Sequence, residues 1–203
     1  MKTTPGTAGY EKHIDRFVTA TEQIPFEVLH RAFLPFLPVA PAQVLDLGAG
    51  IGRDAYELCQ RGFEVTAVEP LITFRQLGQE RYRTSSLIWL DDALPELSTL
   101  DTYQDHFDFI LISGVWHHLD QTEQEQALIR ITALLKVGGK IALSLRHGPA
   151  GAGTHAFPIS TTDLIRQATI QGLMVRLHLS GQASLLPNKS AVLWTRLVLE
   201  KGN

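Results

Sequence analysis

A glycine-rich turn that directly follows a short apolar run constrains this chain more than any other feature. Residues 44–54 read Val-Leu-Asp-Leu-Gly-Ala-Gly-Ile-Gly-Arg-Asp, with glycines at positions 48, 50 and 52. Glycine lets a backbone reverse in conformations that other residues avoid, and it lets a ligand approach main-chain amides closely. Residues 53–61 then have the pattern of a helix whose first amides would face that ligand. The sequence therefore predicts a strand, a nucleoside-binding turn and a helix in succession.

Two acidic residues near this turn indicate that the ligand is cationic and that it contains a ribose. Asp46 lies two residues before Gly48, where its carboxylate would repel a pyrophosphate and suits a cationic ligand better. Glu69 ends the next apolar run, 19 residues after Gly50. An acidic residue at about this spacing accepts ribose hydroxyls in dinucleotide-binding folds. By itself Glu69 could be merely solvated, but together with the glycine turn it predicts a ribose site.

Short β-rich runs alternate with helical patterns along the chain. After a leader with helices expected at 10–20 and 26–37, we expect strands at 43–47, 63–68, 86–90, 107–112 and 140–145, and helices at 53–61, 71–83, 94–100 and 121–136. The tail is expected to form a helix at 161–171 and two strands, 173–179 and 191–199, that can pair as a hairpin. This order predicts a parallel sheet with helices on both faces. We expect one domain over 1–203, with a helical leader or lid at 1–40 and a cofactor-binding core at 42–200.

The acidic residue followed by Gly-x-Gly-x-Gly at 46–52 resembles the first motif of the class I S-adenosylmethionine-dependent methyltransferases. Three later segments are similar to motifs of the same family: Asp92-Ala93, residues 107–119, and residues 134–143 with their Leu-Lys-x-Gly-Gly step. The resemblance covers about residues 44–199. It implies an α/β, three-layer Rossmann-like methyltransferase fold with a seven-stranded, mostly parallel sheet and a C-terminal antiparallel hairpin.

The same resemblance implies S-adenosyl-L-methionine as the cofactor and indicates the residues that bind it. Glu69 would accept both ribose hydroxyls, Asp92 would take the adenine amino group, and the Ser113 carbonyl would accept from the ammonium of the cofactor. Asp92 has a second interpretation, as the N-cap of a helix that begins near residue 94. Tyr10 would form part of a lid, although packing alone would also explain it. The expected cofactor-binding residues are Tyr10, Asp46, Gly48, Ala49, Gly50, Arg53, Glu69, Pro70, Asp92, Ala93 and Ser113.

Three residues at the expected carboxyl ends of strands are candidates for the catalytic or acceptor side. His117 or His147 would act as a general base only where the acceptor has to lose a proton, and the alternative for His117 is to line the pocket or the core. Arg146 precedes a glycine-rich loop, where it would grip an anionic or polar acceptor or else lie in solvent. Adjacent histidines point in different directions, and no metal-binding spacing accompanies His117 and His118, so we expect no metal.

Three other features have structural interpretations. Asp108 is expected to cap the start of a strand at the edge far from the ligand, and Trp194 is expected in the core. The glycine pair at 138–139 is expected to stop a helix before the next strand starts.

Two other functions remain open at this stage. Residues 50–55 satisfy the loose Gly-x-Gly-x-x-Ala form of an NAD(P)-dependent oxidoreductase, but Asp46 and the expected hairpin count against that function. A non-catalytic module that binds S-adenosylmethionine would keep the same motifs. Residues 113–116 are Ser-Gly-Val-Trp where some relatives have Asn-Pro-Pro-Tyr, which disfavours transfer to adenine or glutamine amide nitrogen by that motif.

Composition and charge indicate which classes of partner this chain can have. With 18 basic and 21 acidic residues the formal charge is −3, and no run of Lys or Arg predicts a face for double-stranded nucleic acid. The single Cys59 excludes an internal disulfide. Residues 1–9 lack the apolar centre of a signal peptide, and no apolar stretch is long enough to cross a membrane, so we expect a cytoplasmic protein. A small-molecule acceptor is favoured, a protein acceptor stays open, and the oligomeric state cannot be inferred.

Overall fold

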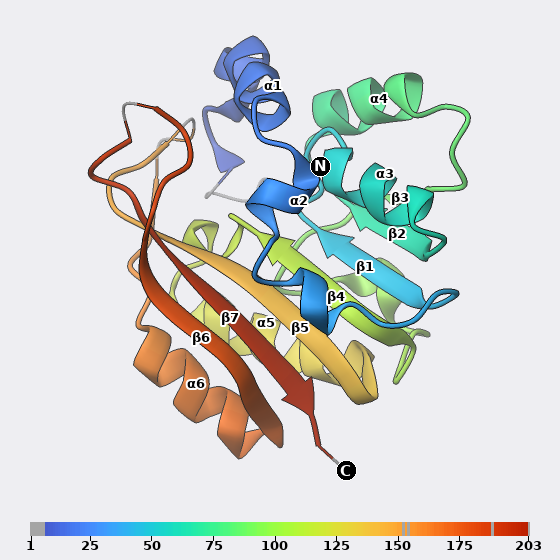
Figure 1. Ribbon diagram of the computed structural model, residues 1–203, viewed down its shortest axis with the longest axis vertical. Coiled ribbons are helices and arrows are strands. Elements are labelled where there is room, and N and C mark those ends of the chain that lie inside the picture. The colour runs from blue at the N-terminus through green and yellow to red at the C-terminus, as the bar shows by residue number, and fades with distance from the viewer. Residues whose placement is uncertain (1–6, 152, 154, 188, 203) are drawn as a thin grey trace.

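A seven-stranded sheet forms the centre of the computed structural model, which describes residues 7–151, 153, 155–187 and 189–202 (Figure 1). The strand order is β3-β2-β1-β4-β5-β7-β6. The first five strands are parallel, and β7 runs antiparallel to both β5 and β6. The bounds are β1 Gln43–Leu47, β2 Glu64–Val68, β3 Ile88–Leu90, β4 Phe107–Ser113, β5 Leu135–His147, β6 Leu173–Ala183 and β7 Leu193–Lys201. The predicted mostly parallel sheet with a C-terminal antiparallel hairpin is confirmed.

Helices cover both faces of the sheet, which gives three layers. The α-helices are α1 Ile14–Glu22, α2 Phe26–Leu29, α3 Arg53–Gln60, α4 Ile72–Arg81, α5 Gln121–Leu134 and α6 Thr161–Ile170, and short 3-10 helices occupy Tyr10–His13, Leu34–Phe36, Ser98–Leu100 and Trp116–His118. Figure 1 shows α1 beyond the end to which β1 and β4 point. No helix in the described part of the chain is long and apolar enough to cross a membrane.

The alternation of side chains along each strand divides the core between the two faces. Val44 of β1 and Phe109 of β4 are register partners and pack with residues of α2 and α3 on one face. The next pair along, Leu45 and Ile110, packs with residues of α5 and α6 on the other face. Because both faces of these parallel strands are buried, their sequences read as nearly continuous apolar runs.

The structure of the N-terminal leader differs from the predicted one. The helix expected at 26–37 is only one turn long, α2, and is followed by the 3-10 turn Leu34–Phe36. Pro35 lacks a main-chain N–H, and its ring disfavours helical geometry at the residue before it. Phe33 is nonetheless fully buried, so the leader packs against the sheet without a long helix.

The glycine pair does not stop a helix as expected. Helix α5 already ends at Leu134, and β5 begins at Leu135 and includes Gly139. Leu135 is a register partner of Phe107, and burying both side chains requires an extended backbone before the glycines. The expected helix at 94–100 is also wrong, since only Ser98–Leu100 forms a 3-10 turn there.

Asp108 has the structural role predicted for it. Its Oδ2 accepts from the Gln43 main-chain N–H at 2.8 Å, and both its oxygens lie 2.9 Å from Lys136 Nζ. These contacts tie the starts of β1, β4 and β5 together at the edge far from the glycine turn.

The start of α5 offers a test of local stability. Asp120 accepts from the Glu123 main-chain N–H at 2.8 Å, and the Glu123 side chain accepts from the Asp120 main-chain N–H at 2.8 Å. We expect Asp120→Ala to lower the free energy of unfolding by about 1 kcal/mol because it leaves helix amides unsatisfied. Thermal unfolding should show a melting temperature lower by about 2–4 °C. The exposed Thr122→Ala in the same turn is the control, and equal melting temperatures for the two variants would contradict the capping role.

Candidate functional site

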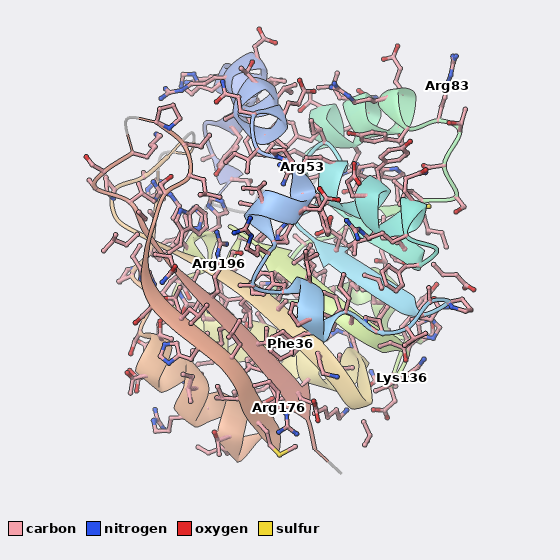
Figure 2. The ribbon with its side chains drawn as sticks, in the orientation of Figure 1. Phe36, Arg53, Arg83, Lys136, Arg176 and Arg196 are labelled. Carbon is pink, nitrogen blue, oxygen red and sulfur yellow. The ribbon has the colours of Figure 1, made fainter. Side chains whose placement is uncertain are left out.

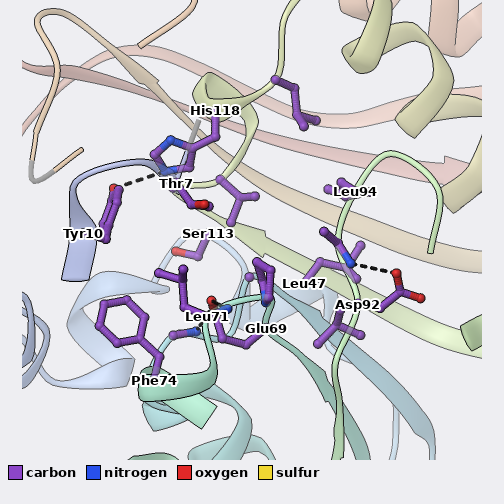
Figure 3. Close-up of a pocket in the computed structure, with 18 of the residues that line it drawn as sticks. Thr7, Tyr10, Leu47, Glu69, Leu71, Phe74, Asp92, Leu94, Ser113 and His118 are labelled. Carbon is purple, nitrogen blue, oxygen red and sulfur yellow. Dashed lines mark hydrogen bonds between the residues drawn. The ribbon is translucent and has the colours of Figure 1, made fainter. Parts of the chain in front are cut away.

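Two adjoining cavities lie where β1, β2 and β4 end. The first cavity, about 100 Å³ in volume, is lined by Glu69, Asp92 and Phe74 among others (Figure 3). The second cavity, about 270 Å³, is lined by His117, Arg146 and residues of β7. The two cavities share five lining residues: Tyr10, Phe17, Gly48, Ser113 and Gly114. A ligand in the first cavity would therefore reach the second at the end of β4.

The glycine turn requires glycine for two physical reasons. Gly48, Gly50 and Gly52 have φ angles of 70°, 58° and 80°, which other residues rarely adopt. A Cβ on Gly48, which lines both cavities, would also lie 2.4 Å from a methyl of Val115 on the wall of the first cavity. The Gly48 and Ala49 main-chain amides donate to the Val68 carbonyl at 2.8 and 3.0 Å. This turn is thus fixed to the end of β2.

Glu69 faces the first cavity from the end of β2. Its two carboxylate oxygens accept from the main-chain amides of Gly50 and Leu71, each at 2.9 Å. Burial raises the pKa of Glu69 to about 7, an effect that these amides and Arg75 only partly offset. A carboxylate oxygen accepts more than one hydrogen bond, so both oxygens can still accept from a ligand.

Asp46 lies at the turn but is not on the wall of either cavity. Its side chain is buried, and its Oδ2 has no hydrogen-bond partner among the residues that the structure describes. Burial, reinforced by the nearby Asp54 carboxylate, raises the pKa of Asp46 well above its usual range. Its predicted contact with the cofactor stays a prediction.

Asp92 lines the first cavity and also holds its own loop. One oxygen accepts from the Ala93 amide at 2.8 Å, and the other accepts from the amide and the hydroxyl of Thr99 at 2.6 and 2.7 Å. The alternative role of Asp92 as the N-cap of a helix near residue 94 is therefore wrong, because only a 3-10 turn at Ser98–Leu100 forms there and its N-cap is Leu97. Contact with adenine stays a prediction, as it does for Pro70 and Ala93 on the same wall.

Aromatic residues of the leader close the first cavity. Tyr10 Oη lies 3.1 Å from His118 Nε2, as Figure 3 shows. Phe17 of α1 stacks on Phe74 of α4 with ring centroids 4.7 Å apart. Burial raises the pKa of Tyr10 to about 12, so its hydroxyl keeps its proton at neutral pH. The leader lies over the site, as its interpretation as a lid requires.

The three candidate catalytic residues do not lie together. His117 and Arg146 line the second cavity, whereas His147 points away from both cavities, with its Nε2 3.0 Å from Thr195 Oγ1. Burial, together with His118 and Arg146, lowers the pKa of His117 to about 2. His117 is therefore a neutral imidazole and a weak base. Among the described residues no group of three acidic, histidine or cysteine side chains could hold a metal ion.

Sequence reasoning missed three residues of the second cavity. Asp54 accepts from Arg53 Nε at 2.8 Å and lies 2.9 Å from His30 Nε2. Burial alone would raise its pKa, but His30 and Arg53 lower it to about 2. Trp194 is not in the core as expected: it is half-buried and lines this cavity together with Arg196. Their spacing of two residues on one strand was the signal, because it puts both on one face.

The core of the chain matches known proteins in sequence. Residues 44–139 match the family described as a methyltransferase domain. An uncharacterized methyltransferase of Mycobacterium tuberculosis is 31% identical over 108 residues, which are 53% of this chain and 41% of that protein. These residues are thus similar in sequence to part of a methyltransferase domain. The chain spans less than half the length of the curated relatives that it matches.

The methyltransferase fold extends beyond that core. The 1,6-didemethyltoxoflavin-N1-methyltransferase of Burkholderia thailandensis, with 1,6-didemethyltoxoflavin and S-adenosylhomocysteine bound, has a TM-score of 0.70 at 22% identity and covers 96% of this chain and 84% of its own. A TehB-like S-adenosylmethionine-dependent methyltransferase of Corynebacterium glutamicum has a TM-score of 0.68 at 21% identity, and the match covers 95% of this chain and 97% of that protein. The predicted fold is confirmed, and the sequence matches support the predicted family. They favour methyl transfer over the oxidoreductase alternative.

The raised pKa of Glu69 predicts how ligand binding depends on pH. Ribose hydroxyls donate best to an ionised carboxylate, and the Glu69 carboxyl is protonated below its pKa of about 7. The affinity for S-adenosylhomocysteine should therefore be constant above about pH 8 and fall roughly tenfold by about pH 6. In Glu69→Gln, which cannot ionise, the affinity should be lower and nearly independent of pH. Calorimetric titrations that give the same pH profile for both proteins would contradict this role.

Proposed function

We propose that this chain transfers the methyl group of S-adenosyl-L-methionine to a small-molecule acceptor that binds in the second cavity. The observation that carries the proposal is the shared wall at Ser113 and Gly114, where the two cavities meet. A donor in the first cavity and an acceptor in the second would approach each other there in line, as displacement at a sulfonium carbon requires.

The donor side uses the residues that line the first cavity. Glu69 would accept the two ribose hydroxyls, and the Asp92-Ala93 step would lie against the adenine. Ser113 ends β4 between the two cavities, where its carbonyl would accept from the ammonium group. Tyr10 and Phe17 would cover the bound cofactor and keep water from the reacting centre.

In this mechanism the protein acts mainly by aligning the donor with the acceptor and by excluding water. Transfer turns a sulfonium cation into a neutral thioether, so the reaction needs no metal and no oxyanion hole. His117, with a pKa of about 2, would position the acceptor as a neutral hydrogen-bonding group more readily than it would remove a proton. His147 has no part in the proposal, because its ring lies outside both cavities.

A small acceptor is favoured by the shape of the site and by one neighbour. The second cavity has the volume of a small molecule or of one chemical group, about 270 Å³. The Burkholderia thailandensis structure, which shares the fold, holds the small molecule 1,6-didemethyltoxoflavin together with S-adenosylhomocysteine. A non-catalytic module that only binds the cofactor is the competing function.

A substitution at the glycine turn tests the donor site. We expect Gly48→Ala to weaken binding of S-adenosylhomocysteine at least about 100-fold, because the new Cβ would collide with Val115 at the cavity wall. Gly172→Ala is the matched control, since Gly172 has a similar φ of 80° but open space around it and lies on the wall of neither cavity. Equal affinities for the two variants in calorimetry would contradict the assignment.

Turnover separates an enzyme from a binding module. We expect the wild-type chain to form S-adenosylhomocysteine from S-adenosylmethionine when it is given a mixture of small acceptors, with Gly48→Ala as the inactive control. Tight cofactor binding without product for any acceptor, small molecule or protein, would favour the non-catalytic module.

A further inference from the structure

Two buried arginines line the second cavity on neighbouring strands. Arg146 of β5 and Arg196 of β7 are only 9% and 8% exposed, and both are on the cavity wall. Arg146 pairs in register with Trp194, two residues from Arg196, so the two arginines are diagonal neighbours. Burying a cation is costly unless a partner compensates it.

The described residues provide neither arginine with an acidic partner. No ion pair within 4.0 Å joins either guanidinium to a carboxylate in the described part of the chain. Arg146 Nη1 is 3.5 Å from the Gly148 carbonyl, which is a long contact, and Arg196 Nη1 donates to Ser144 Oγ. Five N–H donors on each guanidinium far exceed these contacts. The described residues therefore use only a small part of the hydrogen-bonding capacity of the pair.

Aromatic rings hold Arg196 in place. Its guanidinium carbon lies 5.2 Å from the ring centroid of Trp194 and 5.9 Å from that of Phe33. Figure 2 labels Arg196 on the face of the sheet that carries α2. Burial lowers the pKa of Arg196 to about 10, so it remains a cation at neutral pH. The charge is thus fixed in a preformed position.

The rest of the cavity wall adds positive charge. Arg16 and Lys189 also line it. The one carboxylate among its lining residues, Asp54, is already held by Arg53 and His30. This local excess of cations contrasts with the net charge of −3 for the whole chain. An anionic group would therefore be attracted into the cavity.

We propose, on the basis of the function proposed above, that the acceptor is a small molecule carrying a carboxylate or a phosphate, which Arg146 and Arg196 hold together. Planar guanidinium groups bind both oxyanions through paired, charge-assisted hydrogen bonds. Trp194, half-buried on the same wall, covers an apolar part of the acceptor. The accepting atom then faces the end of β4, where the first cavity begins.

The carboxylate of the cofactor's own methionine is the competing occupant. The strand order argues against it, because β4 lies between the two groups of residues. Glu69 follows β2 and Asp92 follows β3 on one side of β4, whereas Arg196 is on β7, two strands away on the other side. The two arginines are thus on the side of β4 away from the ribose and adenine sites.

The test compares binding of the cofactor product with binding of simple anions. Arg196→Met keeps an unbranched side chain between the two rings but removes the charge, and Arg146→Met is the second variant. Arg176→Met is the control, because Arg176 is an exposed arginine of β6 paired with Glu200 and absent from the cavity wall. Melting curves establish that each variant is folded. The probes are benzoate, phenyl phosphate and neutral benzamide, titrated with and without S-adenosylhomocysteine.

We expect wild type and Arg176→Met to bind at least one anion, and to bind it more tightly than benzamide. Arg196→Met or Arg146→Met should lower the affinity for that anion at least about tenfold and leave the affinity for S-adenosylhomocysteine within about twofold of the wild-type value. Whether benzoate or phenyl phosphate binds more tightly identifies the oxyanion.

Three results would overturn the proposal: benzamide binding as tightly as both anions, no binding of either anion, or a large loss of S-adenosylhomocysteine affinity in the arginine variants. If wild type binds the anions but not S-adenosylhomocysteine, the proposed function fails while the anion site stands.

Discussion

The main-chain bonds from Gly48 and Ala49 to the Val68 carbonyl are the contacts on which the site depends. They fix the glycine turn after β1 against the end of β2, and the same turn receives the Glu69 carboxylate through the Gly50 amide. Because β1 also pairs with β4, the turn lies between Glu69 on one side and the end of β4 on the other. One backbone arrangement therefore brings the proposed ribose site and the meeting point of the two cavities together.

Each of the two cavities carries a charge opposite to that of the ligand proposed for it. The acidic residue Glu69 faces the first cavity, whereas Arg146 and Arg196, which form no ion pair with a described residue, face the second. A sulfonium donor and an oxyanionic acceptor would then be bound on opposite sides of Ser113, each beside groups of opposite charge. Burial raises the pKa of Glu69, and it also limits the contact of Arg196 with water. The same loss of solvation therefore affects the charged groups of both cavities.

Sequence patterns predicted those parts of the structure that local chemistry determines. The glycine turn, the alternation of strands and helices and the position of Glu69 after the second strand each follow from patterns along the chain. The spacing of Trp194 and Arg196 puts both on one face of β7, but that this face lines the cavity depends on the insertion of β7 between β5 and β6, which is a long-range pairing. The position of His147 was not predicted because the strand was expected to end at residue 145; β5 continues to His147, so Arg146 and His147 lie on opposite faces of the sheet.

A crystal structure of the chain with S-adenosylhomocysteine is the decisive experiment, because it locates the donor and acceptor sites together. We expect ribose hydroxyls within hydrogen-bond distance of Glu69, the sulfur beside Ser113 facing the second cavity, and no contact of the ligand with Arg146 or Arg196. A ligand whose carboxylate is bonded to Arg196, or a first cavity without adenosine, would contradict this expectation.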